Sequence, residues 1–117
     1  MYKYENKLSV LTLNVQGLRN AKTRKTIFRS FKLDNINVVC LQETYLGNDD
    51  LDLIQREWGG VVHMSPGSAQ TKGRRGLLTL FNKSFTVDSI RLLKQDDRIL
   101  TSELKIGNDS FVFTNIY

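Results

Sequence analysis

The chain has 117 residues and a formal net charge of +5, with 17 Lys and Arg against 12 Asp and Glu. Hydrophobic residues make up 40% of it and charged residues 25%, which is typical of a globular domain and excludes a disordered acidic tail or a fibre. One cysteine cannot form an internal disulfide, so we expect an intracellular, reducing location. No apolar run approaches the roughly 20 residues of a membrane span, and no membrane partner is expected.

The first third of the chain predicts a strand–helix–strand unit. Residues 8–15 form a strand that is apolar on both faces, which predicts a central place in a sheet. Residues 21–33 then carry Ile27, Phe28 and Phe31 on one side of an amphipathic helix. Residues 36–42 are a β-branched apolar run of strand length. Two strands joined in this way by a helix are normally parallel.

The remainder of the chain predicts a short helix and then several strands. The helix begins at Asn48 and carries Leu51, Ile54 and Trp58 at helical spacing. Alternation with a period of two then predicts strands at 61–64, 77–81, 85–93, 99–106 and 111–117, separated by turn residues. We therefore expect an α/β (α+β) fold, with a βαβ start, an antiparallel meander and helices against one sheet.

Polar residues close both strands of the expected parallel pair. Asn14 ends the first strand, and Gln42, Glu43 and Thr44 end the second. Because the C-terminal ends of parallel strands meet at one rim of a sheet, we expect Asn14 and Glu43 to lie side by side there. A carboxylate and an amide suit Mg²⁺, which completes its shell with water and phosphate. The spacing equally fits a Glu43 that only caps the strand or pairs with basic residues.

Basic residues are concentrated between Arg19 and Lys32, where six occur without an acidic residue. Such a segment fits a phosphate-rich partner, because neutralising phosphates releases counterions. It also fits the solvated face of a helix, which is the commoner case. His63 and Cys40 lie in apolar strands, and we expect both to pack rather than to react.

Five segments resemble, in the right order, motifs of the endonuclease/exonuclease/phosphatase family. They are LTLNVQGLR at 11–19, VCLQET at 39–44, RRGLLTLF at 74–81, RILT at 98–101 and TNIY at 114–117. The first two are most similar to the endonuclease domains of LINE-type retrotransposons, relatives of apurinic/apyrimidinic endonucleases. The resemblance implies that residues 1–117 are the N-terminal part of such a domain, incomplete at its C-terminal end. They would supply one sheet with its helices, half of a four-layer α/β sandwich.

The resemblance also implies a set of site residues. Asn14, Glu43 and Tyr117 match catalytic positions of the family: Glu43 would hold Mg²⁺ (or Mn²⁺) against the scissile phosphate, with Asn14 beside it and the Tyr117 hydroxyl on the phosphate. Gln16 stands where many members have Asp, and a neutral amide at this position weakens any second metal site. The basic residues Arg19, Arg74 and Arg75 are candidate substrate contacts.

The family's general-base His, its paired Asp and the Asp and Asn of a GD(F/L)N motif follow the segment matching TNIY. The resemblance therefore implies a Mg²⁺-dependent DNA endonuclease of retrotransposon type when complete, and we expect the isolated chain to be inactive. Expected partners are DNA and the remaining half of the domain or a downstream reverse transcriptase, with self-association through an uncovered sheet as another outcome. A retrotransposon origin would imply a nuclear location.

Two alternatives stay open from the sequence. The first is another phosphoesterase of the same superfamily, similar to inositol phosphatases, sphingomyelinases or deadenylases. The second is a non-catalytic remnant that binds nucleic acid or protein.

Overall fold

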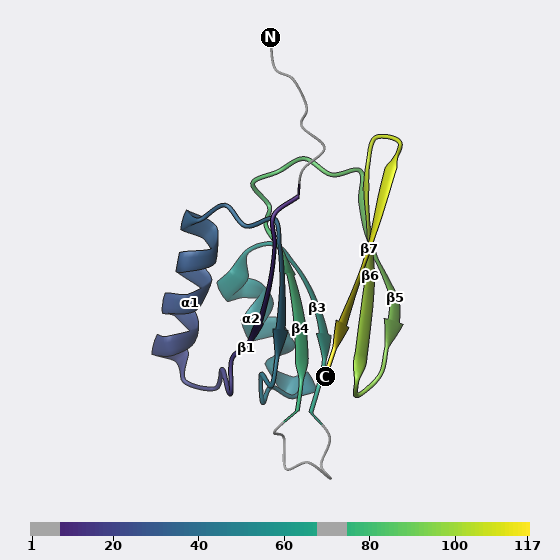
Figure 1. Cartoon of the computed structure of the whole chain (residues 1–117). Coiled ribbons are helices and arrows are strands. Elements are labelled where there is room, and N and C mark those ends of the chain that lie inside the picture. Colours follow the sequence, from purple (N-terminus) through teal and green to yellow (C-terminus); the bar gives the residue numbers. More distant parts are fainter. Residues whose placement is uncertain (1–7, 68–74) are drawn as a thin grey trace.

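The computed structural model describes residues 8–67 and 75–117, and these form three layers (Figure 1). Two α-helices cover one face of a four-stranded sheet, and a three-stranded sheet packs on the other face. In chain order the elements are β1 (Val10–Asn14), α1 (Ala21–Leu33), β2 (Val38–Gln42), the 3₁₀-helix η1 (Asn48–Asp50), α2 (Leu51–Trp58), β3 (Val61–Ser65), β4 (Leu77–Phe81), β5 (Ser89–Gln95), β6 (Ile99–Ile106) and β7 (Asp109–Ile116). The predicted α/β (α+β) fold class is confirmed.

The first sheet has the strand order β1-β2-β4-β3. β1 and β2 are parallel, and Asn14 pairs with Gln42, so the predicted βαβ unit is confirmed. β4 is antiparallel to both of its neighbours, β2 and β3. The C-terminal ends of β1, β2 and β3 therefore lie at the same end of the sheet as the N-terminal end of β4.

The strands after α2 differ from the expected single meander, because they are divided between two sheets. β4 inserts between β2 and β3, whereas β5, β6 and β7 form a separate antiparallel sheet. All residues of β4 are buried, which requires a central strand covered on both faces. In β6 burial alternates, which is the pattern of a sheet with one covered face. Periodicity identifies each strand but not the sheet to which it belongs.

The prediction of a central first strand was wrong for the described part of the chain. β1 is an edge strand there, and its apolar residues Val10 and Leu13 are 48% and 42% exposed. β7 is likewise an edge strand of the second sheet, with Val112 and Ile116 exposed. Both edges thus present apolar side chains to solvent, which soluble domains usually cover.

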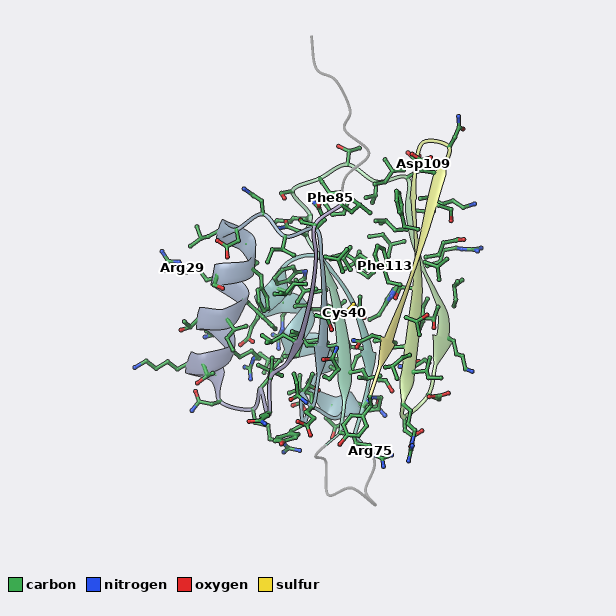
Figure 2. The ribbon with its side chains drawn as sticks, viewed as in Figure 1. Arg29, Cys40, Arg75, Phe85, Asp109 and Phe113 are labelled. Atoms are coloured by element: carbon green, nitrogen blue, oxygen red, sulfur yellow. The ribbon has the colours of Figure 1, made fainter. Side chains whose placement is uncertain are left out.

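Two separate apolar cores hold the three layers together. The larger core lies between the helices and the first sheet and includes Phe28, Ile54 and Trp58. The smaller one lies between the two sheets and includes Cys40, with Phe113 packed against it, as Figure 2 shows. Burial raises the pKa of the Cys40 thiol, which keeps it protonated and unreactive.

A buried ion pair joins the two helices. Arg24 of α1 is 3% exposed, and its Nε and Nη2 donate to the two carboxylate oxygens of Glu57 in α2. Its Nη1 donates to the carbonyls of Leu18 and Arg19, at 2.9 and 3.2 Å, so the same guanidinium also fixes the loop between β1 and α1. Hydrogen bonding to Arg24 lowers the pKa of Glu57.

In the described part of the chain, no helix is long and apolar enough to cross a membrane.

Candidate functional site

Four residues singled out by the sequence lie at one end of the first sheet, which we call the rim. Asn14 ends β1, Glu43 directly follows β2, Arg75 lies two residues before β4, and Tyr117 directly follows β7. Figure 1 shows these strand ends together with the C-terminus, and Figure 2 labels Arg75 among them. The expectation that Asn14 and Glu43 are neighbours agrees with this placement, because Asn14 pairs with the residue before Glu43.

Backbone hydrogen bonds fix the segment that carries Glu43 on both sides. On one side, the N–H groups of Gly17 and Leu18 donate to the carbonyls of Glu43 and Thr44, at 2.7 and 2.9 Å. On the other side, the N–H groups of Thr44 and Tyr45 donate to the carbonyls of Gly76 and Arg75, at 3.2 and 3.0 Å. The carboxylate is therefore placed by a segment held between two loops, which makes its position well defined.

The rim concentrates unusual backbone conformations. Gln16, Glu43 and Tyr45 have φ values of 51°, 55° and 62°, in the left-handed region that residues with a side chain seldom adopt. Gly17 has φ 110°, and a Cβ there would lie 2.9 Å from the Tyr45 ring. Each such residue costs of order 1 kcal/mol or more, and costs of this kind cluster at functional sites.

Two residues at the rim carry hard oxygen donors. Glu43 is half-buried, and among the described residues no side chain or backbone N–H hydrogen-bonds its carboxylate. Asn14 is exposed, and its Oδ1 accepts from the Gln16 N–H at 3.2 Å, which orients the amide. Within residues 8–67 and 75–117 no group of three His, Cys, Asp or Glu residues could enclose a metal. One carboxylate and one amide fit Mg²⁺, which keeps several waters and takes phosphate oxygens as further ligands.

Arg75 connects Tyr117 to the rest of the rim. Its guanidinium lies over the Tyr117 ring, 5.1 Å from the ring centroid, in a cation–π contact. It also forms an ion pair with Asp97, with Nη1 3.2 Å from Oδ2. The Tyr117 N–H donates to the Arg98 carbonyl at 2.9 Å. Arg75 thus holds a tyrosine ring and a hairpin while its own carbonyl binds the segment after Glu43.

Arg19 and Arg74 are the other two basic residues that the sequence predicts as substrate contacts. Arg19 is exposed and lies on the loop that leads from Asn14 to α1, so it borders the rim. Arg74 lies outside the described residues.

His63 was predicted to pack in an apolar strand, and in the structure its Nδ1 hydrogen-bonds Ser102 of the second sheet at 2.7 Å. Burial lowers the pKa of His63.

Sequence reasoning gave no role to Asn115, which joins the two sheets directly behind the rim. Its Nδ2 donates to the carbonyls of Leu41 and Leu78, each at 3.2 Å. Its Oδ1 accepts from Gln42 Nε2 at 2.8 Å. The available signal was its phase: Asn115 is in step with the inward-facing Phe113, so a polar residue occupies a core position two residues before Tyr117.

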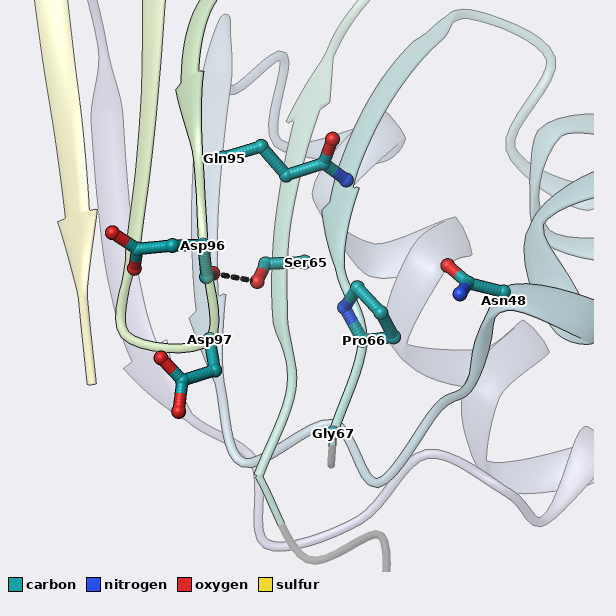
Figure 3. A pocket seen from close by; sticks show the side chains of 7 residues that line it. All are labelled: Asn48, Ser65, Pro66, Gly67, Gln95, Asp96 and Asp97. Carbon is teal, nitrogen blue, oxygen red and sulfur yellow. Dashed lines mark hydrogen bonds between the residues drawn. The ribbon is translucent and has the colours of Figure 1, made fainter. Parts of the chain in front are cut away.

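A cavity of about 410 Å³ adjoins the rim at the end of β3 (Figure 3). It is lined by residues of three segments: Asn48, Ser65, Pro66, Gly67, Gln95, Asp96 and Asp97. The Ser65 hydroxyl donates to the Asp96 carbonyl, which ties the β5–β6 turn to β3. Two backbone N–H groups lower the pKa of Asp96, so this carboxylate stays ionised.

Residues 11–117 match the model of the endonuclease/exonuclease/phosphatase family, and the chain belongs to this family. The match confirms the resemblance seen in the sequence, and it covers every motif segment. Comparison with curated protein sequences gave no match.

Solved structures show the same fold. The AP endonuclease LMAP from Leishmania major aligns with a TM-score of 0.68 and 23% identity, over 92% of this chain and 38% of that one. The endonuclease domain of TRAS1, a telomere-specific non-LTR retrotransposon, aligns with a TM-score of 0.60 and 13% identity, over 94% and 45%. Truncated TDP2 from Caenorhabditis elegans gives 0.55 and 21%, over 91% and 43%. The chain thus spans less than half the length of these structures.

Proposed function

We propose that this chain is the N-terminal portion of a divalent-metal-dependent phosphodiesterase domain that nicks DNA, of the retrotransposon endonuclease type. The observation that carries the proposal is that family motifs far apart in the sequence bring Asn14, Glu43, Arg75 and Tyr117 to one rim. Similarity of fold to an AP endonuclease and to a retrotransposon endonuclease domain supports the nuclease assignment.

Each rim residue has a distinct part in the proposed reaction. The Glu43 carboxylate, which has no partner among the described side chains, holds Mg²⁺ or Mn²⁺, and the Asn14 amide lies beside it. A divalent ion held there would supply Lewis acidity at a phosphoryl oxygen and would offset the charge that develops on it. The Tyr117 hydroxyl donates to a phosphate oxygen, and Arg75 keeps the ring in place through its 5.1 Å contact. The base that activates the attacking water is not among these residues.

In the proposed complete enzyme, additional polypeptide completes the domain. The exposed edges of β1 and β7 border one groove of about 470 Å³, lined by residues of both sheets. Val10, Val112 and Ile116 present apolar surface at these edges. Strands of the remaining half, or of a neighbouring polypeptide, would pair with the free backbone groups and cover this surface. Self-association of the 117-residue chain through the same edges is the competing outcome, and sedimentation equilibrium distinguishes it from a monomer.

A nicking assay on supercoiled plasmid tests the assignment of an incomplete site. With Mg²⁺, we expect the 117-residue chain to give little or no relaxed product, because the base and the later acidic ligands are missing. Robust nicking that Glu43→Ala abolishes would contradict this, since it would show a complete active site in these residues. Glu103→Ala is the matched control, because Glu103 ion-pairs with Arg91 on the second sheet, away from the rim.

A binding competition distinguishes a DNA substrate from an inositol polyphosphate or another phosphate ester. Binding is measured with Ca²⁺ in place of Mg²⁺ to suppress hydrolysis, and duplex DNA competes against inositol hexakisphosphate at equal phosphate concentration. The proposal expects DNA to bind more tightly, because the basic residues extend along a helix instead of surrounding one pocket. Stronger binding of the inositol phosphate would favour the alternative phosphoesterase.

A further inference from the structure

The exposed side of α1 carries a line of basic residues that the rim does not account for. Lys22, Lys25, Arg29 and Lys32 follow one another at intervals of three and four residues. At 100° per residue they fall within an arc of about 80°, and at 1.5 Å per residue they extend over about 15 Å. Figure 2 shows Arg29 pointing away from the sheet. We call these four residues the α1 stripe.

The stripe differs from an ordinary solvated helix face because its charges are not balanced. α1 contains no acidic residue, and among the described residues Lys22, Lys25 and Arg29 have no carboxylate within ion-pair distance. The Lys25 charge contributes to lowering the pKa of Glu57, but Arg24 occupies both oxygens of that carboxylate. The positive charge of the stripe is thus left for an external partner.

This arrangement opposes the stability of the helix that carries it. Successive members of the stripe are i, i+3 or i, i+4 neighbours, and like charges at these spacings destabilise a helix by roughly 0.2–0.5 kcal/mol per pair. The first turn also lacks the acidic residues that complement the helix dipole and instead contains Lys22, with Arg19 just before it. A local conflict with stability of this kind points to a functional role.

The stripe begins at the rim. α1 starts seven residues after Asn14, and its N-terminal end lies at the same end of the molecule as the ends of β1 and β2 (Figure 1). Arg19 bridges the interval, because it is exposed on the loop between them. Lys32 closes the stripe at the far end, where its Nζ lies over the Trp58 ring and donates to the Glu57 carbonyl. A polyanion at the rim can therefore continue along α1.

We propose that the α1 stripe binds the sugar–phosphate backbone of duplex DNA that flanks the nicked phosphate, a role that rests on the proposed function. Its length of about 15 Å corresponds to about four base pairs of duplex, which present one phosphate charge per ~1.7 Å of axis. The contacts are to phosphates alone, so they give affinity and register without sequence preference. The DNA runs on the α1 side because Asp49 and Asp52 make the start of α2 acidic and exposed.

Binding measured without metal tests this surface separately from the chemistry of the rim. Fluorescence anisotropy follows a labelled duplex of about 20 base pairs with the 117-residue chain in EDTA, over a series of KCl concentrations. For Lys25→Gln/Arg29→Gln we expect the salt slope to fall by about 1.8 and the affinity near 0.1 M salt to fall at least tenfold, as about two lost phosphate contacts require. Lys94→Gln/Lys105→Gln removes the same charge from exposed positions of the second sheet and should leave both values within twofold.

The outcomes separate this inference from the proposed function. Glu43→Gln should bind DNA in EDTA no more weakly than the wild type, because it removes a negative charge from the rim, so a loss of metal binding is distinguishable from a loss of the stripe. Equal losses in the two double variants, or no loss in Lys25→Gln/Arg29→Gln, would overturn the stripe and leave the rim chemistry untouched. Vesicles of phosphatidylcholine and phosphatidylserine serve as the second polyanion. Tighter binding to them than to DNA, lost in Lys25→Gln/Arg29→Gln, would also overturn it.

Discussion

Replacing Asn115 tests how the two sheets support the rim. The side chain is 2% exposed, and its amide makes three strong contacts: two donated to the Leu41 and Leu78 carbonyls and one accepted from Gln42. Asn115→Ala removes all three and leaves a small void between the sheets.

The expected magnitude follows from these contacts. A buried hydrogen bond contributes about 1 kcal/mol, so three amount to about 3 kcal/mol. The void adds about 1 kcal/mol. The loss is limited because Gln42 Nε2 keeps two further acceptors, Thr12 Oγ1 at 3.0 Å and the Cys40 carbonyl at 3.1 Å. We therefore expect Asn115→Ala to lower the free energy of unfolding by about 3–4 kcal/mol.

Urea denaturation followed by circular dichroism measures this change. Thr114→Ala is the control, because the neighbouring Thr114 is exposed and makes only a 3.3 Å contact with Thr101. It should cost less than about 0.5 kcal/mol. If Asn115→Ala were as stable as Thr114→Ala, the amide would not join the sheets, and the structural role assigned to Asn115 behind the rim would be wrong.

Three further predictions concern pH and backbone strain. The folded pKa of Glu57 is lowered, so the stabilisation from its pair with Arg24 is complete above the unfolded value of 4.5 and is lost as pH falls through the folded pKa. Glu57→Gln should therefore cost about 3 kcal/mol at pH 7, and in urea titrations it should converge on the wild type as pH falls below the folded pKa; a constant difference would contradict the pair. Burial lowers the folded pKa of His63 below 6.5 because it disfavours the charged ring, so folding stability is complete above pH 6.5 and falls as pH drops from 6.5 through the folded pKa. His63→Gln should flatten the unfolding free energy in that interval, and an unchanged pH profile would show that His63 does not titrate on unfolding. Gly76 has φ 122°, and a Cβ there would lie 2.4 Å from Thr44 Oγ1, so Gly76→Ala should lower the thermal midpoint by several degrees, corresponding to about 2 kcal/mol. Gly107→Ala is the control, because a Cβ at Gly107 would meet nothing within 4 Å. An equal loss of stability in both variants would show that backbone strain alone, and not the contact with Thr44, causes the effect.

The sequence predicts the helices and strands of this chain more completely than it predicts how the strands pair. The apolar face of α1 and the alternation in β6 are local patterns, and the bounds of both elements agree with the prediction. The insertion of β4 between β2 and β3 depends on long-range pairing, which no local period encodes. The exposed edge position of β1 could not be read from residues that are apolar on both faces, since such a strand is normally central.

The residues of the candidate site could be predicted where they belong to family motifs. The tertiary contacts that complete the site could not be predicted from the sequence. Asn14 and Glu43 could be placed at one rim because they end two strands joined by a helix. The stacking of Arg75 on Tyr117 joins residues far apart in the sequence, so no local signal indicates it. The buried state of Arg24 was also hidden, because it lies in a run of basic residues that resembles a solvated helix face.

Paramagnetic broadening by Mn²⁺ in the ¹⁵N-labelled chain tests the central claim, a divalent-metal site at Glu43, most directly. We predict that substoichiometric Mn²⁺ selectively broadens the backbone amides at 14–17 and 43–45, that Glu43→Gln removes this broadening, and that Asp109→Asn, at the exposed start of β7, retains it. Broadening centred elsewhere, or broadening at the rim that persists in Glu43→Gln, would contradict the assignment of Glu43 as the metal-binding carboxylate.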